Sequence, residues 1–177
     1  MHKEHLKTNI TQNGFTLIEL IIVIVILGIL AVTAAPRFID ISTDSNISAL
    51  KGMGGSIDSL ATLVNAKAAI QGLNKSASAV IDLDNDGVGD VNTAYGYPTA
   101  ARTNGIASIL GDDFNEHWSW ATNNSESVFY VGTASRIGSS GFYINGSKHT
   151  AANCYISYRN ATGFASKPSI EYITDGC

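Results

Sequence analysis

Glu19 is a carboxylate inside an otherwise apolar run of the chain. The sixteen residues from Leu20 to Ala35 carry no charge, and the twenty-one from Phe15 to Ala35 carry only this one. A helix of that length covers about 30 Å, enough to cross the hydrocarbon core of a bilayer. A carboxylate at that depth costs on the order of a few kcal/mol and needs a partner. Cleavage between Gly14 and Phe15 would place a new α-amino group four residues from Glu19, and the two charges could pair within one helix or between staggered copies of the chain.

A second group of carboxylates lies in residues 82–90, which read Asp-Leu-Asp-Asn-Asp-Gly-Val-Gly-Asp. Carboxylates at positions 1, 3 and 5 converge where the backbone turns at a following glycine, as in the first half of an EF-hand calcium loop. The candidate ligands are Asp82, Asp84, Asp86, the carbonyl of Val88, and Asp90 directly or through water. Position 12 is Thr93 instead of the usual bidentate glutamate. The sequence leaves two interpretations open, a structural calcium ion and a solvated acidic turn.

Cys154 and Cys177 are the two cysteines of the chain, and the second is its last residue. Lys3 and Lys7 precede the apolar run, which by the positive-inside rule places the N-terminus in the cytoplasm and the rest of the chain outside. Because an exported chain meets an oxidising compartment, we expect a disulfide between the cysteines rather than two buried thiols. Such a bridge should stabilise the fold by roughly 3 kcal/mol and hold the C-terminus in place.

Four aromatic residues and one histidine gather in the middle of the chain: Tyr95, Tyr97, His117, Trp118 and Trp120. They could line a sugar site, but we favour a local core that holds a loop on a sheet. His117 and His149 could be combined on paper into a catalytic set. However, the sequence contains no Gly-x-Ser-x-Gly, His-Glu-x-x-His or phosphate-binding loop. It therefore indicates structural histidines and no enzyme.

The elements that position these groups begin with a second, amphipathic helical pattern after Arg37. Apolar residues recur at steps of three and four residues, at Leu50, Met53, Ile57, Leu60 and Val64. This stripe predicts a helix that covers a sheet and ends near Gly72. Pro36, between the apolar and the amphipathic pattern, removes one helical hydrogen bond and predicts a kink.

We expect irregular structure from about 74 to 126, since Gly, Asn, Asp and Thr are frequent there. The last third predicts four short strands that are rich in β-branched and aromatic residues: Ser127–Val131, Gly141–Asn145, Cys154–Arg159 and Ser169–Thr174. Short connections between them favour an antiparallel, meander-like sheet. The fold class is α+β.

Composition excludes some functions. The 177 residues carry a net charge of −4, and removal of residues 1–14, with Lys3, Lys7 and Glu4, leaves 9 basic and 14 acidic residues and a net charge of −5. A nucleic-acid binder would need a basic face, so no nucleic acid is expected as a partner.

An ordinary secretory signal peptide, cut near Val32–Ala34, competes with the anchor interpretation. A signal peptide of that kind would not explain why the apolar run contains the carboxylate of Glu19.

The tract Gly14-Phe15-Thr16-Leu17-Ile18-Glu19 resembles the cleavage and N-methylation motif of type IV pilins. The likeness continues through the apolar run, Pro36 and the following helix. Residues 31–38 and 94–98 resemble more narrowly the MSHA (mannose-sensitive haemagglutinin) group of type IVa pilins.

This resemblance implies a type IV pilin-like fold, with a long N-terminal helix that is half transmembrane and packs on a C-terminal antiparallel sheet. It divides the chain into a cleaved leader (1–14), a transmembrane and filament-core helix (15–36), an amphipathic helix (37–72), an αβ-loop (73–126), and a sheet with a disulfide loop (127–177). Gly14 and Phe15 would flank the cut, and Phe15 would be N-methylated. Glu19, Phe15 and Pro36 would serve assembly.

The implied function is that of a structural subunit of an MSHA-like pilus for surface attachment, adhesion and biofilm formation. The implied partners are other copies of the chain, a prepilin peptidase, the assembly machinery and surface glycans. The chain would lie in the inner membrane of a Gram-negative bacterium as a precursor and then in an extracellular pilus. No cofactor is required, and a structural calcium ion is the one candidate. The alternatives are a pseudopilin of a type II secretion system and a membrane-anchored binding protein that never polymerises.

Overall fold

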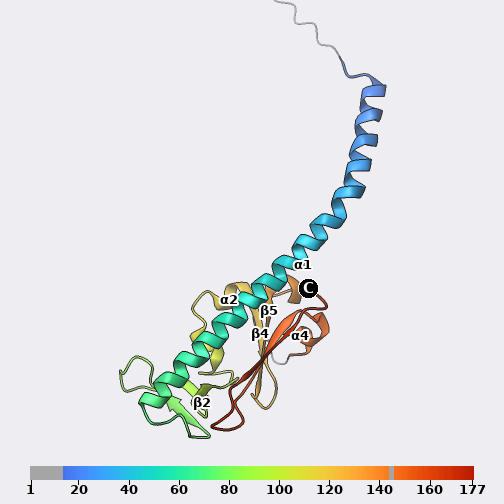
Figure 1. Cartoon of the computed structure of the whole chain (residues 1–177). Helices are drawn as coiled ribbons and strands as arrows, with labels where there is room; N and C mark the ends of the chain where they lie inside the picture. Colours follow the sequence, from blue (N-terminus) through green and yellow to red (C-terminus); the bar gives the residue numbers. More distant parts are fainter. Residues whose placement is uncertain (1–13, 144–145) are drawn as a thin grey trace, which may run out of the picture. The chain divides into compact units, whose positions relative to one another are not determined.

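A computed structural model describes residues 14–143 and 146–177, with the side chains of 35–40 left out. The predicted leader therefore lies outside the described residues except for Gly14. The chain divides after Ile41 into two compact units, an N-terminal unit and a folded unit of residues 42–177. One helix, α1 (Leu17–Ile70), contributes to both units. Figure 1 shows α1 and the strands of the folded unit.

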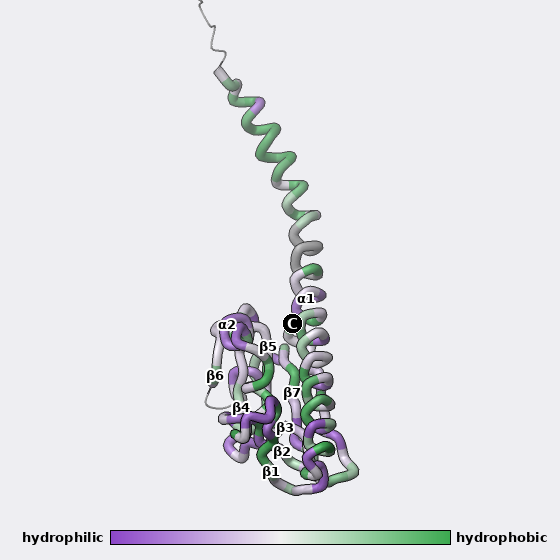
Figure 2. The backbone as a smooth tube through the Cα atoms, turned by 90° about the vertical axis from the view of Figure 1, so that its left-hand side faces the viewer, coloured by the Kyte–Doolittle hydropathy of each residue, from purple (hydrophilic) through white to green (hydrophobic). Residues whose placement is uncertain are grey.

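The N-terminal unit is the apolar part of α1. Residues Leu17–Ala34 have a mean hydropathy of 3.0, none of this segment is buried, and by length and composition it could cross a membrane. Figure 2 shows it as a nearly continuous hydrophobic tube. Aliphatic side chains cover every side of the helix, so this unit has no polar face to turn toward water. Pro36 lies within α1, and its side chain lies outside the described residues.

In the folded unit, α1 buries the predicted stripe. Leu50, Ile57 and Val64 are each at most 1% exposed, while Met53 and Leu60 are half-buried. The helix ends at Ile70, and Gly72 follows with a left-handed φ of 72°. The amide of Leu73 donates to the carbonyl of Ala68 at 2.8 Å, which closes the end of the helix. The predicted helix end at Gly72 is thus confirmed, because glycine adopts this conformation without a Cβ penalty.

Five strands form the main sheet in the order β6-β4-β5-β7-β8. Their bounds are Trp118–Thr122 for β4, Val128–Thr133 for β5, Gly141–Tyr143 for β6, Tyr155–Arg159 for β7 and Ser169–Ile173 for β8. All four predicted strands are present as β5 to β8, although residues 144–145 of the second prediction lie outside the described residues. The long helix with a C-terminal sheet confirms the α+β class.

The predicted meander is wrong, and so is the purely antiparallel sheet. Strand β6 does not lie between β5 and β7 but pairs in parallel with β4, with Ser119 opposite Gly141. The reason is the short helix α3 (Ala134–Ile137), which follows β5 directly and leads the chain past β4 to the far edge of the sheet. The sheet is therefore mixed, with β6 as its one parallel edge strand among the described strands.

The expectation of irregular structure from 74 to 126 is also wrong. A second, three-stranded antiparallel sheet contains β1 (Ala79–Ile81), β2 (Val91–Ala94) and β3 (Tyr97–Pro98). The 3-10 helix η1 (Ile106–Ile109) and helix α2 (Phe114–His117) follow. Strand β4 then opens the main sheet. Buried residues from α1 and this small sheet, including Val64, Ala68, Ile81 and Val91, form a core cluster of their own.

The two faces of the main sheet differ in chemistry because successive side chains point to opposite sides. Trp120, Phe129, Ile156 and Tyr158 share one core cluster with Leu50 and Ile57 of α1. Figures 1 and 2 both show this part of α1 alongside the sheet. The other face carries Ser119, Ala121, Tyr130 and Ser157, and helix α4 (Ser147–Ala152) contacts it.

Candidate functional site

The predicted cleavage site lies just outside the helix. Gly14, Phe15 and Thr16 precede α1, and Phe15 is 90% exposed. A Cβ added at Gly14 would meet no atom within 4 Å. An exposed segment without regular secondary structure is the kind of backbone that a peptidase can reach. The bond between Gly14 and Phe15 is thus accessible in the described structure.

Glu19 has a partner that sequence reasoning missed. Its carboxylate accepts hydrogen bonds from the Thr16 amide at 2.8 Å and from the Thr16 hydroxyl at 2.7 Å. In return, the Glu19 amide donates to the Thr16 hydroxyl at 3.3 Å. This is a capping box, in which Thr16 precedes the helix and Glu19 is its third residue. The Thr-x-x-Glu spacing was the signal for it. The uncut chain therefore satisfies the carboxylate locally.

The acidic segment 82–90 forms the loop of the β1–β2 hairpin, in which Ile81 pairs with Val91. Carboxylate oxygens of Asp82, Asp84 and Asp86 lie within 4.8 Å of one another. Backbone amides organise this loop from within. The backbone amides of Asn85 and Gly87 donate to the Asp82 carboxylate at 2.6 and 3.0 Å.

Hydrogen bonds within the loop favour the ionised form of Asp82. Desolvation tends to raise the pKa of Asp82, but the amide donors of Gly87 and Asn85 outweigh it, so this pKa lies below its usual value. Three ionised carboxylates at such short range repel one another unless a cation lies between them. Hard oxygen donors of this kind suit calcium.

Two other residues of the calcium pattern do not join this cluster. The Asp90 carboxylate accepts the Leu83 amide at 2.7 Å and so ties the end of the loop to its start. Thr93 is 1% exposed within β2, and its hydroxyl donates to the Ala79 carbonyl at 3.1 Å. The hairpin therefore brings three of the predicted carboxylates together, while Asp90 and Thr93 stabilise its frame.

The predicted disulfide is confirmed. Cys154 and Cys177 are bonded, with their Cα atoms 4.9 Å apart, and both are buried. The Gly176 amide donates to the Asn153 carbonyl at 2.8 Å, and the Arg136 guanidinium donates to the Gly176 carbonyl. The C-terminal turn is thus held by a covalent bond and by hydrogen bonds from two other segments.

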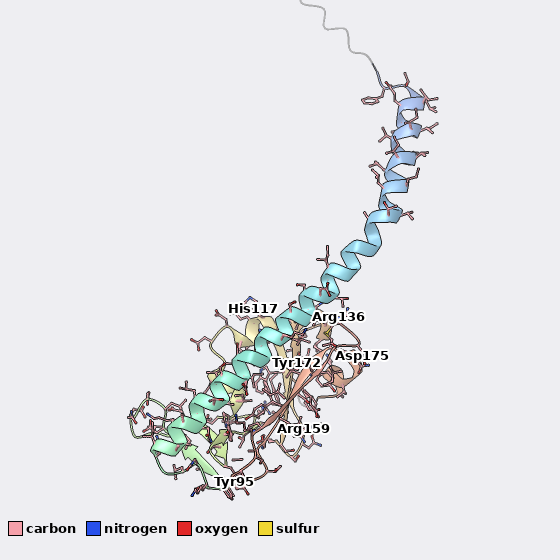
Figure 3. The ribbon with its side chains drawn as sticks, in the orientation of Figure 1. Tyr95, His117, Arg136, Arg159, Tyr172 and Asp175 are labelled. Carbon is pink, nitrogen blue, oxygen red and sulfur yellow. A yellow bond between two sulfur atoms is a disulfide. The ribbon has the colours of Figure 1, made fainter. Side chains whose placement is uncertain are left out.

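The aromatic residues do not form one binding site. Trp120 is 7% exposed, contacts the Phe142 ring at a centroid distance of 4.7 Å, and donates its indole proton to Asn115 at 2.7 Å. Figure 3 places His117 and Tyr95 at opposite ends of the folded unit. The core interpretation therefore holds for Trp120.

An open groove runs along α1 in the folded unit. Its α1 side is formed by Gly52, Gly55, Ser56, Ser59 and Leu60, its other side by residues 109–111, and its volume is about 690 Å³. No charged side chain lines it. Leu63 and Ile70 continue this side of the helix and are 63% and 83% exposed. The groove is thus a surface of small residues where another helix could approach closely.

Comparisons with known proteins agree with the N-terminal geometry. Residues 10–35 match the family model described as the prokaryotic N-terminal methylation motif. The chain is 34% identical over 100 residues to the type IV narrow pilus major component PilA5 of Thermus thermophilus. That alignment covers 56% of this chain and 72% of the relative. No solved structure matches the chain.

Proposed function

The chain belongs to the type IV pilin family, and we propose that it is the structural subunit of an MSHA-like pilus that serves surface attachment, adhesion and biofilm formation. The observation that carries this proposal is the segment 14–34. It joins an exposed Gly14–Phe15 segment, a capped glutamate and a helical segment of spanning length whose one charge is that glutamate. The pilin family is structural rather than enzymatic. A membrane-anchored precursor that later enters a pilus fits this segment.

The first step of the proposed mechanism is maturation. The precursor waits in the inner membrane of a Gram-negative cell, held by Leu17–Ala34. A prepilin peptidase cuts between Gly14 and Phe15 and methylates the new amine of Phe15. Methylation preserves the positive charge of that amine. Maturation therefore adds a cation at the N-terminus, close to the Glu19 carboxylate.

Assembly follows from an exchange of partners at Glu19. In the uncut chain, Thr16 satisfies the carboxylate with two hydrogen bonds. After cleavage, the charged amine of a neighbouring copy is the stronger partner, because it adds the attraction between two full opposite charges to the hydrogen bond. A pair of this kind between copies would set the stagger of the helices. The apolar sides of α1 would then be buried against one another inside the filament.

Two further features of α1 support this arrangement. The groove beside Gly52, Gly55 and Ser56 offers an uncharged surface, with small residues on the helix side, for contact between copies. Pro36 marks a point where the helix lacks one hydrogen bond and could lose helical structure as copies pack. The exposed parts of residues 73–126 and 155–176 would then face outward, and surface glycans are the proposed targets there.

The variant Glu19→Ala tests the assembly step. We expect normal cleavage and methylation but no filaments in the sheared surface fraction, because the pairing carboxylate is gone. Thr16→Ala is the matched control, since it removes one side of the capping box and keeps the carboxylate. It should assemble. Filament yield is measured by immunoblot, and processing by intact mass. Normal yield from Glu19→Ala would remove the pairing mechanism, and equal loss in Thr16→Ala would show that capping is what matters.

We also propose that Asp82, Asp84 and Asp86 hold a calcium ion that orders the β1–β2 loop. Calcium at ten times its dissociation constant should stabilise the processed chain by about 1.4 kcal/mol. The measurement is thermal unfolding with and without calcium, for the processed protein and for Asp84→Asn. Asp112→Asn, at an exposed aspartate elsewhere, is the control. The same calcium response in all three proteins would contradict this site.

A further inference from the structure

His149 is fully buried between α4 and the polar face of the main sheet. It is 0% exposed, and its Nε2 lies 3.0 Å from the carbonyl oxygen of Ser119 on β4. A carbonyl oxygen can only accept, so Nε2 carries the proton of the neutral ring. Nδ1 then presents a lone pair. Among the described residues, this nitrogen and the Ser119 hydroxyl are buried without a hydrogen-bond partner.

The groups around His149 offer no counter-charge. Two tyrosine rings face it, Tyr130 of β5 and Tyr143 of β6, at centroid distances of 6.4 and 6.2 Å. The Tyr155 ring of β7 contacts the Tyr130 ring at a centroid distance of 5.8 Å. The nearby charges on the covering segment are positive. Lys148 lies 4.2 Å above the Tyr143 ring, and the Arg136 guanidinium of α3 binds the C-terminal turn.

The carboxylates on this side are engaged elsewhere or exposed. Glu171 of β8 accepts the Ser157 hydroxyl at 3.4 Å and lies 4.0 Å from the Arg159 guanidinium. Asp175, in the C-terminal turn, is exposed (Figure 3). Residues 144–145 are isoleucine and asparagine, which carry no charge. Burial accordingly lowers the pKa of His149, against a smaller opposing effect of the hydrogen bond with Ser119.

We propose that His149 is an acid-sensitive latch, which holds the segment 134–153 on the sheet while its ring is neutral and releases α4 when the ring is protonated. Protonation would put a charge and a second N–H donor into a fully buried position. None of the groups named above is an anion in contact with the ring that could balance the charge. Opening α4 lets water reach the ring and removes that penalty.

The sign of the pH dependence follows from the lowered pKa. The neutral ring contributes its full stabilisation above the ordinary histidine pKa of about 6.5, and this contribution is lost as the pH falls below that value. The opening constant of α4 should then rise by up to tenfold per pH unit. The release is local, because the core between α1 and the sheet contains no part of α4 and the bridge from Cys154 to Cys177 persists.

The chain offers a matched control. After Phe15 it contains two histidines, the buried His149 and the exposed His117. His149→Gln keeps an N–H for the Ser119 carbonyl but cannot be protonated in this range. His117→Gln removes the exposed imidazole instead. Amide hydrogen exchange of residues 146–153, expressed as protection factors to correct for intrinsic rates, is measured from pH 7 to 4 on the processed chain in detergent. The imidazole signals are followed by NMR in the same samples.

We expect protection of 146–153 to fall with pH in the unaltered chain and in His117→Gln, and to stay constant in His149→Gln. The His149 ring should remain neutral well below pH 6.5 and titrate together with the loss of protection. A ring that titrates near 6.5 while α4 stays protected would overturn the latch, even if His149→Gln failed to fold. If the protection of residues 146–153 fell with pH as much in His149→Gln as in the unaltered chain, the latch would also be overturned. This inference does not depend on the proposed function, because it concerns the folded unit alone.

Discussion

The two parts of α1 differ in how their apolar residues are arranged. Between Leu17 and Ala34 they surround the helix, and none of this segment is buried. From residue 42 to Ile70 they form one stripe, of which Leu50, Ile57 and Val64 are buried by the rest of the same chain. The apolar side chains of the first part can be buried only by lipid or by other copies of the chain. The second is satisfied within one molecule.

This difference separates the residues that govern processing and assembly from those that govern the free energy of unfolding. Changes in the first part should alter processing and assembly and leave the folded unit intact. Changes in the second part should alter the free energy of unfolding and leave processing intact. Three predictions test this separation, beginning with the largest effect.

The largest expected effect is that of Gly14→Glu. We expect uncut precursor in the membrane and no filaments, because a bulky charged side chain would occupy the position just before the bond to be cut. Immunoblots of membrane and sheared fractions measure this. Gly28→Ala is the control, since a Cβ also meets open space there, and it should be processed normally. Efficient processing of Gly14→Glu would undo the cleavage assignment.

Loss of the disulfide should be the next largest effect. The bridge joins residues 23 apart, and loop-closure entropy for that length predicts a stabilisation of about 3 kcal/mol. Cys154→Ser with Cys177→Ser should therefore lower the urea midpoint of the folded unit, while Phe15 remains the first residue of the processed chain. Reduction of the unaltered protein should give the same midpoint. An unchanged midpoint would show that other contacts hold the C-terminal turn.

The smallest effects separate two neighbouring glycines of α1. A Cβ at position 54 would overlap the Tyr172 ring, whereas one at position 55 would meet no atom within 4 Å. Gly54→Ala should destabilise the folded unit relative to Gly55→Ala, because the Tyr172 ring, which is 44% exposed, must move aside. Gly55→Ala should stabilise it by up to about 1 kcal/mol through helix propensity. Thermal unfolding measures both. Equal shifts would mean that Tyr172 does not pack closely on the helix.

Tyr172→Ala offers an internal check on this pair. It removes the ring from the space beside Gly54. If the ring is the cause, Gly54→Ala should cost much less in that background. The cost of Gly55→Ala should not depend on residue 172.

Features defined by local pattern could be predicted from the sequence. The buried stripe, the four later strands and the pairing of the two cysteines each follow from spacing or residue type along one segment. The capping box of Thr16 and Glu19 was also readable, since its Thr-x-x-Glu spacing is local. The sequence analysis instead assigned the α-amino group of Phe15, in the same or a neighbouring copy, as the partner of Glu19.

Features set by long-range pairing could not be predicted in this way. Trp118–Thr122 follows a long run of turn-forming residues and resembles a loop until its partners in β5 and β6 are known. The parallel placement of β6 depends on α3, which is only four residues long. In the acidic loop, Asp90 completes the sequence pattern, but its hydrogen bond with Leu83 appears only in the folded hairpin. The sequence indicated His149 as a structural histidine, but its contact with the Ser119 carbonyl depends on the packing of α4 against β4.

The most direct test of the account is N-terminal sequencing and intact mass of the protein recovered from the sheared cell surface. We predict that it begins at methylated Phe15 and that its mass is two protons below that of the reduced chain. This outcome would establish the processing and the bridge between Cys154 and Cys177 in one sample. A start near Ala35, or only uncut chain in the membrane, would contradict the account that this protein is a processed and assembled pilin.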